Sequence, residues 1–114
     1  MNDCLFCKIA RGEIPSDKVF EDDSILAFRD IHPQAARHVL IIPKTHLSGL
    51  NGLEGAGDAL LARLLRAARS VAKETGIDES GYRLVANCGK HACQSVQHLH
   101  FHLLGGEQLS EKMV

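Results

Sequence analysis

Three histidines alternate with apolar residues in the segment His98-Leu99-His100-Phe101-His102. Successive side chains of an extended strand face opposite sides, so a strand here would place the three imidazoles on one face and the two apolar side chains on the other. An imidazole titrates near neutral pH, binds metal ions and can attack phosphorus or an acyl carbon. Because Thr, Gln or Lys would serve equally well on a merely polar face, this segment is the first candidate for chemistry.

Three interpretations of these histidines compete: a solvated polar face, a shared metal ion, and a nucleophile whose neighbours fix its protonation. On a strand the Cα atoms of His98 and His102 are about 13 Å apart, whereas a Zn–N bond measures about 2 Å. Two of the histidines could therefore share one metal, but all three would need a sharply bent strand. We favour the nucleophile, since flanking imidazoles and backbone carbonyls can hold one ring nitrogen protonated and leave the other to attack.

A second pattern is the pair Cys4 and Cys7, which has the spacing of half a tetrahedral zinc site. The chain has four cysteines, which in a reducing compartment are expected to be thiols or metal ligands rather than disulfides. A redox-active pair is the alternative, but the motif lacks the preceding strand-helix-strand context that such pairs have.

The elements that must position these residues are those of a small α+β protein. Apolar runs bounded by turn residues predict strands, and one long amphipathic stretch predicts a helix. Strands are expected over residues 19–21, 24–30, 38–43, 82–87 and 96–104, and helices over residues 4–10 and 53–75. Consecutive strands after short turns predict an antiparallel sheet of about five strands with the long helix laid on it.

The long helix is expected to bury an apolar stripe and to expose basic residues on its other side. The stripe consists of Leu60, Leu61, Leu64, Leu65, Ala68, Val71 and Ala72. Gly76 suits the left-handed position that follows a helix. We do not expect a small sheet to cover the whole stripe, which leaves part of it available to a second copy of the chain.

The composition is that of one soluble globular domain, expected to span residues 1–114. A formal net charge of −1 argues against electrostatic binding to nucleic acid or anionic membranes, which needs a basic patch. No apolar run approaches the ~20 residues of a membrane-spanning helix, and the first residues do not resemble a signal peptide. A cytoplasmic protein without nucleic-acid or membrane partners is therefore expected.

Several motifs together resemble the histidine-triad (HIT) superfamily. Residues 98–104 match its alternating pattern of histidine and apolar residues, and Gly105-Gly106 is similar to the Hint branch, the histidine-triad nucleotide-binding proteins, rather than to the Fhit branch. The resemblance covers nearly the whole chain. Further counterparts of Hint motifs stand at residues 5–9, 13–15, 21–23, 28–31, 33–35, 41–44, 81–83 and 94–96.

The resemblance implies a hydrolase of purine nucleoside phosphoramidates and related AMP or GMP conjugates. His100 would attack the α-phosphorus in line and become transiently nucleotidylated. The other residues that the resemblance places in the catalytic group are His102, His38 and Ser95. It assigns nucleotide binding to Asp30 at the ribose, to Asn87, Ser95, His100 and His102 at the phosphate, and to Leu5, Phe6, Ile9, Phe28 and Ile31 at the purine.

These assignments rest on the joint order of the residues with the histidines. Asp30 and Asn87 also suit turns in their own right, while Ser95 and His38 would be ordinary at the entry or edge of a strand. The resemblance further implies a homodimer and a structural zinc ion, which some relatives hold with a cysteine pair and two histidines. The corresponding residues here are Cys4, Cys7, His46 and His98.

The chain departs from the Hint pattern in two places. Ala92-Cys93 stands where these proteins often have two glycines, so the phosphate loop is expected to differ in shape, and the segment after Gly106 differs from the usual ending. A Fhit-like hydrolase of dinucleoside polyphosphates is one alternative, opposed by Gly105-Gly106 and by the single cation, Lys90, between residues 84 and 106. A zinc-stabilised nucleotide-binding module without a catalytic task is the other.

Overall fold

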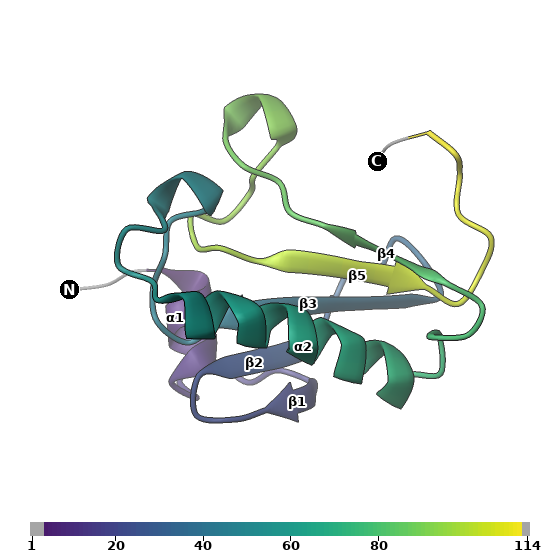
Figure 1. Cartoon of the computed structure of the whole chain (residues 1–114), viewed down its shortest axis with the longest axis horizontal. Helices are drawn as coiled ribbons and strands as arrows, with labels where there is room; N and C mark the ends of the chain where they lie inside the picture. Colours follow the sequence, from purple (N-terminus) through teal and green to yellow (C-terminus); the bar gives the residue numbers. More distant parts are fainter. Residues whose placement is uncertain (1–3, 113–114) are drawn as a thin grey trace.

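A five-stranded antiparallel sheet forms the centre of the structure, a computed structural model that describes residues 4–112 (Figure 1). The strands are β1 (Lys18–Glu21), β2 (Ile25–Arg29), β3 (Arg37–Pro43), β4 (Tyr82–Val85) and β5 (Phe101–Gly105), in the spatial order β1-β2-β3-β5-β4. The helices are α1 (Leu5–Ala10) and α2 (Asp58–Glu74), with short 3-10 turns over Leu50–Gly52 and Lys90–Ala92. The predicted α+β architecture is confirmed.

Helix α2 lies across one face of the sheet (Figure 1). Its buried residues follow the i, i+3, i+4, i+7, i+8 spacing of a stripe that faces a core, and they are Leu64, Ala67, Ala68, Val71 and Ala72. The prediction of Leu65 in this stripe is wrong, because its side chain is 58% exposed. Leu65 lies about 100° around the helix axis from Leu64, just beyond the margin of the buried stripe.

The opposite face of the sheet is divided between α1 and an open region. Phe6 and Ile9 of α1 pack with residues of β2 and β3, among them Phe28 and Leu40. Residues that lie opposite one another on neighbouring strands share a face of the sheet. His102 of β5 lies opposite both Leu40 of β3 and Val85 of β4, so the face that α1 covers at Leu40 continues onto β5 and β4. The candidate catalytic histidines therefore lie where the cover of α1 ends.

The predicted histidine strand is too long at its start. The prediction placed a strand over residues 96–104, but β5 begins at Phe101, so His98 and His100 precede it. In the register that pairs Ile41 with Phe101, Leu99 would face Pro43, which has no N–H to donate to a ladder. Leu99 instead donates its backbone N–H to the carbonyl of Leu47 at 2.6 Å.

The histidines and the apolar residues of this segment still lie on opposite faces of the sheet, as predicted, although the strand is shorter. Leu99 and Leu103 are buried in the core cluster beneath α2, while the ring of His100 lies 5.1 Å from that of Phe6 on the other side of the sheet. The segment before β5 is therefore extended enough to alternate, although it forms no ladder.

The other boundaries differ by small amounts. Helix α2 begins at Asp58 rather than at Leu53, because Gly55 and Gly57 supply a flexible approach that costs helix stability. Strand β4 ends at Val85 rather than at Asn87. Gly76 has the expected positive φ of 78°. Within the described part of the chain, no helix is both long enough and apolar enough to cross a membrane.

Candidate functional site

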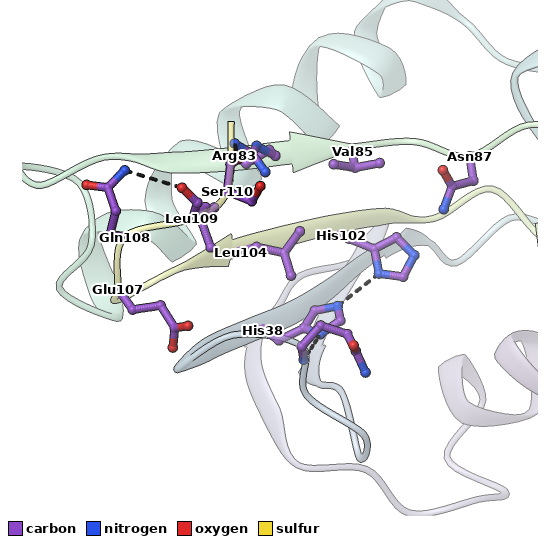
Figure 2. Close-up of a pocket in the computed structure, with 11 residues that line it drawn as sticks. His38, Arg83, Val85, Asn87, His102, Leu104, Glu107, Gln108, Leu109 and Ser110 are labelled. Atoms are coloured by element: carbon purple, nitrogen blue, oxygen red, sulfur yellow. Dashed lines mark hydrogen bonds between the residues drawn. The ribbon is translucent and has the colours of Figure 1, made fainter. Parts of the chain in front are cut away.

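Two histidines from neighbouring strands form a hydrogen-bonded pair at the centre of the site. His38 on β3 and His102 on β5 point toward one another (Figure 2), with 2.9 Å between His38 Nε2 and His102 Nδ1. In the register of the two strands, His38 lies opposite Leu104 and His102 opposite Leu40. Both side chains thus project from the face that α1 only partly covers.

The hydrogen bonds of this pair determine which nitrogen carries the proton in each ring. The backbone N–H of Gln34 donates to His38 Nδ1 at 3.0 Å, so the proton of a neutral His38 is on Nε2. The Nε2–H of His38 donates to His102 Nδ1, and the same nitrogen lies 3.4 Å from the Asp30 carboxylate. The proton of a neutral His102 is consequently on Nε2, which makes this nitrogen a hydrogen-bond donor toward the site.

Both rings are held in their neutral form near pH 7. The pKa of His102 is lowered to about 4, first by burial and then by the nearby His100 and His38, while Asp30 opposes the shift. Burial also lowers the pKa of His38, again against the Asp30 carboxylate. Because both shifts have burial as their largest cause, the neutral tautomers are the forms available for chemistry.

His100 has the opposite tautomer. Its Nδ1 lies 2.7 Å from the carbonyl oxygen of His98, and since a carbonyl only accepts, Nδ1 carries the proton and Nε2 carries the lone pair. The side chain is 3% exposed, and its ring centre lies 5.2 Å from that of His102. The site thus combines a nucleophilic nitrogen on His100 with an N–H donor on His102.

The other predicted polar residues, Asp30, Asn87 and Ser95, have different surroundings. Asp30 caps a turn and also faces the histidine pair: one carboxylate oxygen accepts the backbone N–H of His32 at 2.8 Å, and the other lies 3.4 Å from His38 Nε2. Asn87 lines a cavity together with His102. Ser95 is exposed, and no hydrogen bond joins it to the histidines within residues 4–112.

The residues predicted to hold a purine divide into two groups. Phe6, Ile9 and Phe28 are buried and pack on the sheet as part of the apolar cluster beneath α1. Leu5 and Ile31 are 45% and 86% exposed. The predicted purine residues therefore differ in accessibility, with only the exposed pair open to a ligand without a rearrangement.

A cavity of about 430 Å³ opens beside the histidine pair on the region of the sheet that α1 leaves uncovered. Figure 2 shows His102 and Asn87 at one part of it, with Arg83 and the segment 107–110 farther along β4 and β5. Its lining consists of Gln34, His38, Arg83, Val85, Asn87, His102, Leu104, Glu107, Gln108, Leu109 and Ser110. Only three of these residues, His38, Asn87 and His102, were predicted as site residues from the sequence. Arg83 and Val85 alternate along β4 like the residues of any strand, so the sequence pattern did not single them out.

A second cluster joins the N-terminal helix to the segment before β5. Cys4 Sγ lies 3.3 Å from His98 Nδ1, and Cys7 Sγ lies 3.3 Å from His46 Nδ1 and 3.5 Å from His98 Nδ1. The four potential ligand atoms all lie within 4.8 Å of one another. The predicted set of Cys4, Cys7, His46 and His98 is therefore brought together, although the ligands come from three separate segments.

This cluster fits a zinc ion in its donor types, its spacing and its supporting hydrogen bonds. Tetrahedral zinc binds thiolates at about 2.3 Å and imidazoles at about 2.0 Å, which places neighbouring ligand atoms roughly 3.5 Å apart. His98 Nε2 donates to the carbonyl of Pro43 at 2.8 Å, which leaves its Nδ1 lone pair directed at the cysteines. The backbone N–H of Cys7 also donates to Cys4 Sγ at 3.4 Å. The Pro43 carbonyl has no side-chain signature that a sequence could reveal.

Asp30, His38 and His102 form a second group with metal-ligand spacing. The hydrogen bond between the two imidazoles uses the His102 Nδ1 lone pair, and the Gln34 N–H uses that of His38 Nδ1. A metal would need these lone pairs. The geometry therefore favours a proton-ordering network over a metal site here.

Comparisons with known proteins agree with this geometry. The family model described as "HIT domain" matches residues 11–109. The chain is 47% identical over 105 residues to the purine nucleoside phosphoramidase of Escherichia coli, covering 92% of this chain and 88% of that protein. It is 51% identical over 111 residues to a 14 kDa zinc-binding protein of Brassica juncea, covering 95% and 96%. The crystal structure of a HIT family hydrolase from Legionella pneumophila superposes with a TM-score of 0.92 at 52% identity, covering 96% and 97%.

Proposed function

The chain belongs to the HIT domain family, and on that premise we propose that it hydrolyses purine nucleoside 5′-phosphoramidates and related AMP or GMP conjugates. The observation that carries this proposal is the pair of opposite tautomers at His100 and His102. A lone pair beside a fixed N–H donor suits attack on a phosphorus atom whose oxygens need hydrogen bonds. The name of the similar Escherichia coli enzyme supports the substrate class.

In the first step, His100 Nε2 attacks the α-phosphorus while the bond from phosphorus to the leaving nitrogen breaks. A phosphoramidate that is protonated on this nitrogen releases a neutral amine, so the step takes no proton from the enzyme. His102 donates its Nε2–H to a phosphate oxygen, where negative charge is concentrated. The product is AMP or GMP bound covalently through phosphorus to His100.

In the second step, a water molecule attacks the phosphorus of the nucleotidylated histidine. The phosphorus–Nε2 bond breaks, the nucleotide leaves with the new oxygen, and the proton of the water passes to solvent. His100 recovers its neutral form because the His98 carbonyl keeps the proton on Nδ1 throughout. Positioning by the fixed tautomers supplies much of the catalysis, as is general for phosphoryl transfer.

The nucleotide is proposed to lie across the α1 side of the histidine pair. Asp30 would accept hydrogen bonds from the ribose hydroxyls, and Asn87 and Ser95 would contact the phosphate. The base would cover Leu5 and Ile31 above the buried aromatic residues. An apolar support with a few polar contacts is the usual composition of a small-molecule site.

A zinc ion is proposed at Cys4, Cys7, His46 and His98, where it would fix structure and take no part in the reaction. By holding His98, it would position the carbonyl that orders the His100 tautomer. A homodimer is also proposed, since Leu65 on α2 and Tyr82 on the edge strand β4 expose apolar surface.

The test is the release of AMP from adenosine 5′-phosphoramidate by the wild type and by His100→Asn. Asparagine has no comparable nucleophile, so kcat is expected to fall by about a thousandfold or more. His91→Asn is the matched control, because this histidine is exposed in the 3-10 turn Lys90–Ala92, and it is expected to retain wild-type rates. No release by the wild type would overturn the proposed function. Equal rates for His100→Asn would overturn the assignment of the nucleophile.

A further inference from the structure

Positively charged side chains line a second cavity, away from the histidine pair, where the C-terminal end of α2 meets the sheet. This cavity has a volume of about 550 Å³, and three of its lining side chains are cations while one is a carboxylate. The lining consists of Lys18, Val19, Arg29, Arg37, Glu74 and Thr75. We propose that this cavity binds a small anion that carries two linked phosphate groups.

The sheet separates this cavity from the reacting histidines. Ala27 of β2 and Val39 of β3 belong to the core cluster beneath α2. Because side chains two positions apart on a strand share a face, Arg29 and Arg37 project toward α2 as well. His38 follows Arg37 on β3 and projects from the opposite face. An anion in this cavity would therefore occupy a site distinct from the proposed site of hydrolysis.

The two arginines stand close enough to hold one ligand together. Arg29 lies opposite Val39 on the neighbouring strand, and Arg37 precedes Val39 by two positions. A strand separation of about 4.8 Å and a rise of about 3.4 Å per residue place the two Cα atoms roughly 8 Å apart. A guanidinium is a planar fork that binds phosphate oxygens in pairs. Two such groups on neighbouring strands suit an anion with oxygens on two linked phosphorus atoms.

Both arginines are available to a ligand. Arg37 donates to the backbone carbonyl of Ala36 at 3.2 Å, and it forms no ion pair within residues 4–112. Arg29 Nε lies 3.3 Å from the Asp17 carboxylate, but these two side chains are 50% and 72% exposed. Exposed ion pairs contribute little to stability, so the exchange of Asp17 for a ligand costs little.

Lys18 supplies the third positive charge. Its Nζ lies 3.0 Å from one oxygen of Glu21, while Lys44 Nζ lies 2.7 Å from the other oxygen. Glu21 therefore keeps a cationic partner when Lys18 turns toward a ligand. A phosphate group carries a charge of about −1.5 to −2 near neutral pH. Two linked groups thus match three cations better than a single phosphate does.

Glu74 is the opposing charge in the lining. Among the described residues, no ion pair joins its carboxylate to any of the three cations. It therefore repels an anionic ligand without neutralising a particular cation. Its removal should strengthen binding, which is a result that a folding defect cannot imitate.

The test is a calorimetric titration of the protein with pyrophosphate, and the wild type is expected to show one saturable site that weakens as salt is added. The double variant Arg29→Gln, Arg37→Gln is expected to bind at least about tenfold more weakly, as for the loss of charge-assisted hydrogen bonds. The matched control is Arg66→Gln, Arg69→Gln, which removes two exposed arginines of α2 outside the cavity. This control is expected to keep the wild-type Kd within about twofold.

A second pair of variants tests the opposing carboxylate. Glu74→Gln is expected to lower the Kd for pyrophosphate by about two- to fivefold, because one repulsion is removed. Glu54→Gln removes an exposed carboxylate outside the cavity and is expected to leave the Kd unchanged. An unchanged Kd in Glu74→Gln would contradict the proposed location of the anion.

Three further results would overturn the site: no saturable binding of pyrophosphate by the wild type, equal weakening in the two double arginine variants, or equal affinity for inorganic phosphate. Loss of binding in His102→Asn, with retention in Arg29→Gln, Arg37→Gln, would place the anion at the histidines instead. Competition with ADP distinguishes two sources of the same chemistry. Displacement of pyrophosphate assigns the linked phosphates of a nucleotide to the cavity, and no displacement assigns a free diphosphate.

Discussion

His100 and His102 are two positions apart, yet their hydrogen-bond partners give them opposite tautomers. The partner of His100 Nδ1 is a carbonyl, which can only accept. The partner of His102 Nδ1 is His38 Nε2, which must donate because the Gln34 N–H occupies the other nitrogen of that ring. The tautomer of each residue, and with it the proposed choice of nucleophile, is therefore determined by backbone groups and a neighbouring strand.

The depressed pKa of His102 predicts a loss of stability in acid. The unfolded chain takes up this proton as the pH falls through the ordinary value of 6.5, but the folded protein does so only near 4. Stability is therefore complete above about pH 6.5 and falls as the pH approaches 4. Thermal unfolding between pH 7 and pH 4.5 is expected to show a smaller decrease in Tm for His102→Asn than for the wild type.

The comparison between the two proteins isolates this residue. Acid effects at the cysteine-histidine cluster are common to both and cancel in the difference. An equal decrease in Tm for the wild type and His102→Asn would contradict the depressed pKa.

The β4–β5 connection contains Ala92-Cys93, where the sequence pattern predicted a loop of different shape. Cys93 follows the 3-10 turn with φ 61° and ψ 40°, and it is the sole non-glycine residue with positive φ in the described part of the chain. A left-handed conformation costs a residue with a Cβ roughly 1 kcal/mol. The loop thus keeps the backbone shape that glycine would adopt freely, at a cost in stability.

Cys93→Gly is therefore expected to stabilise the protein by about 0.5–1 kcal/mol in urea unfolding. Ala92→Gly is the matched control in the same turn, where the ordinary backbone gives glycine no advantage, and it is expected to be neutral or destabilising. A loss of stability in Cys93→Gly would show that the cysteine side chain contributes more than its backbone strain costs.

The sequence predicted these elements unevenly, for physical reasons. Hydrophobic periodicity located β3 and the C-terminal end of α2 to within one residue, because it reports which side of an element is buried, but it began α2 five residues too early. It extended the histidine strand too far because the alternation continues back to His98, beyond the ladder, whose last pair is Ile41 and Phe101. Side-chain spacing indicated the histidines of residues 98–102 and the pair Cys4 and Cys7, whereas the other candidate site residues were implied by the resemblance to the histidine-triad superfamily. Gln34, Pro43 and His98 act through backbone groups, and such contacts have no pattern in the sequence.

At the scale of the whole molecule, the cysteine-histidine cluster joins segments that are far apart in the chain. Cys4 and His98 are separated by 94 positions, and Cys7 and His46 by 39. A metal ion there would tie α1 to the segment before β5 and so hold together the two sides of the proposed nucleotide site. A metal that binds the folded chain but not the unfolded chain raises the free energy of unfolding with the logarithm of the metal concentration.

Removal of the metal is expected to reduce stability before it reduces activity. Chelation should lower the free energy of unfolding by more than about 2 kcal/mol, while the protein that is still folded hydrolyses phosphoramidate at a comparable kcat. Elemental analysis is expected to find one zinc per chain in the wild type and none in a Cys4→Ala, Cys7→Ala variant. Immediate loss of kcat with unchanged Tm would instead indicate a metal at the reacting centre.

Hydrolysis is proposed to proceed by two displacements through a covalent bond to His100. The stereochemistry at phosphorus tests it most directly, whether or not the intermediate accumulates. An adenosine 5′-phosphoramidate in which sulfur replaces one phosphate oxygen, prepared as a single configuration, is hydrolysed in water labelled with heavy oxygen. Two in-line displacements predict net retention of configuration in the product. Net inversion would mean that water attacks directly and that His100 is not the nucleophile.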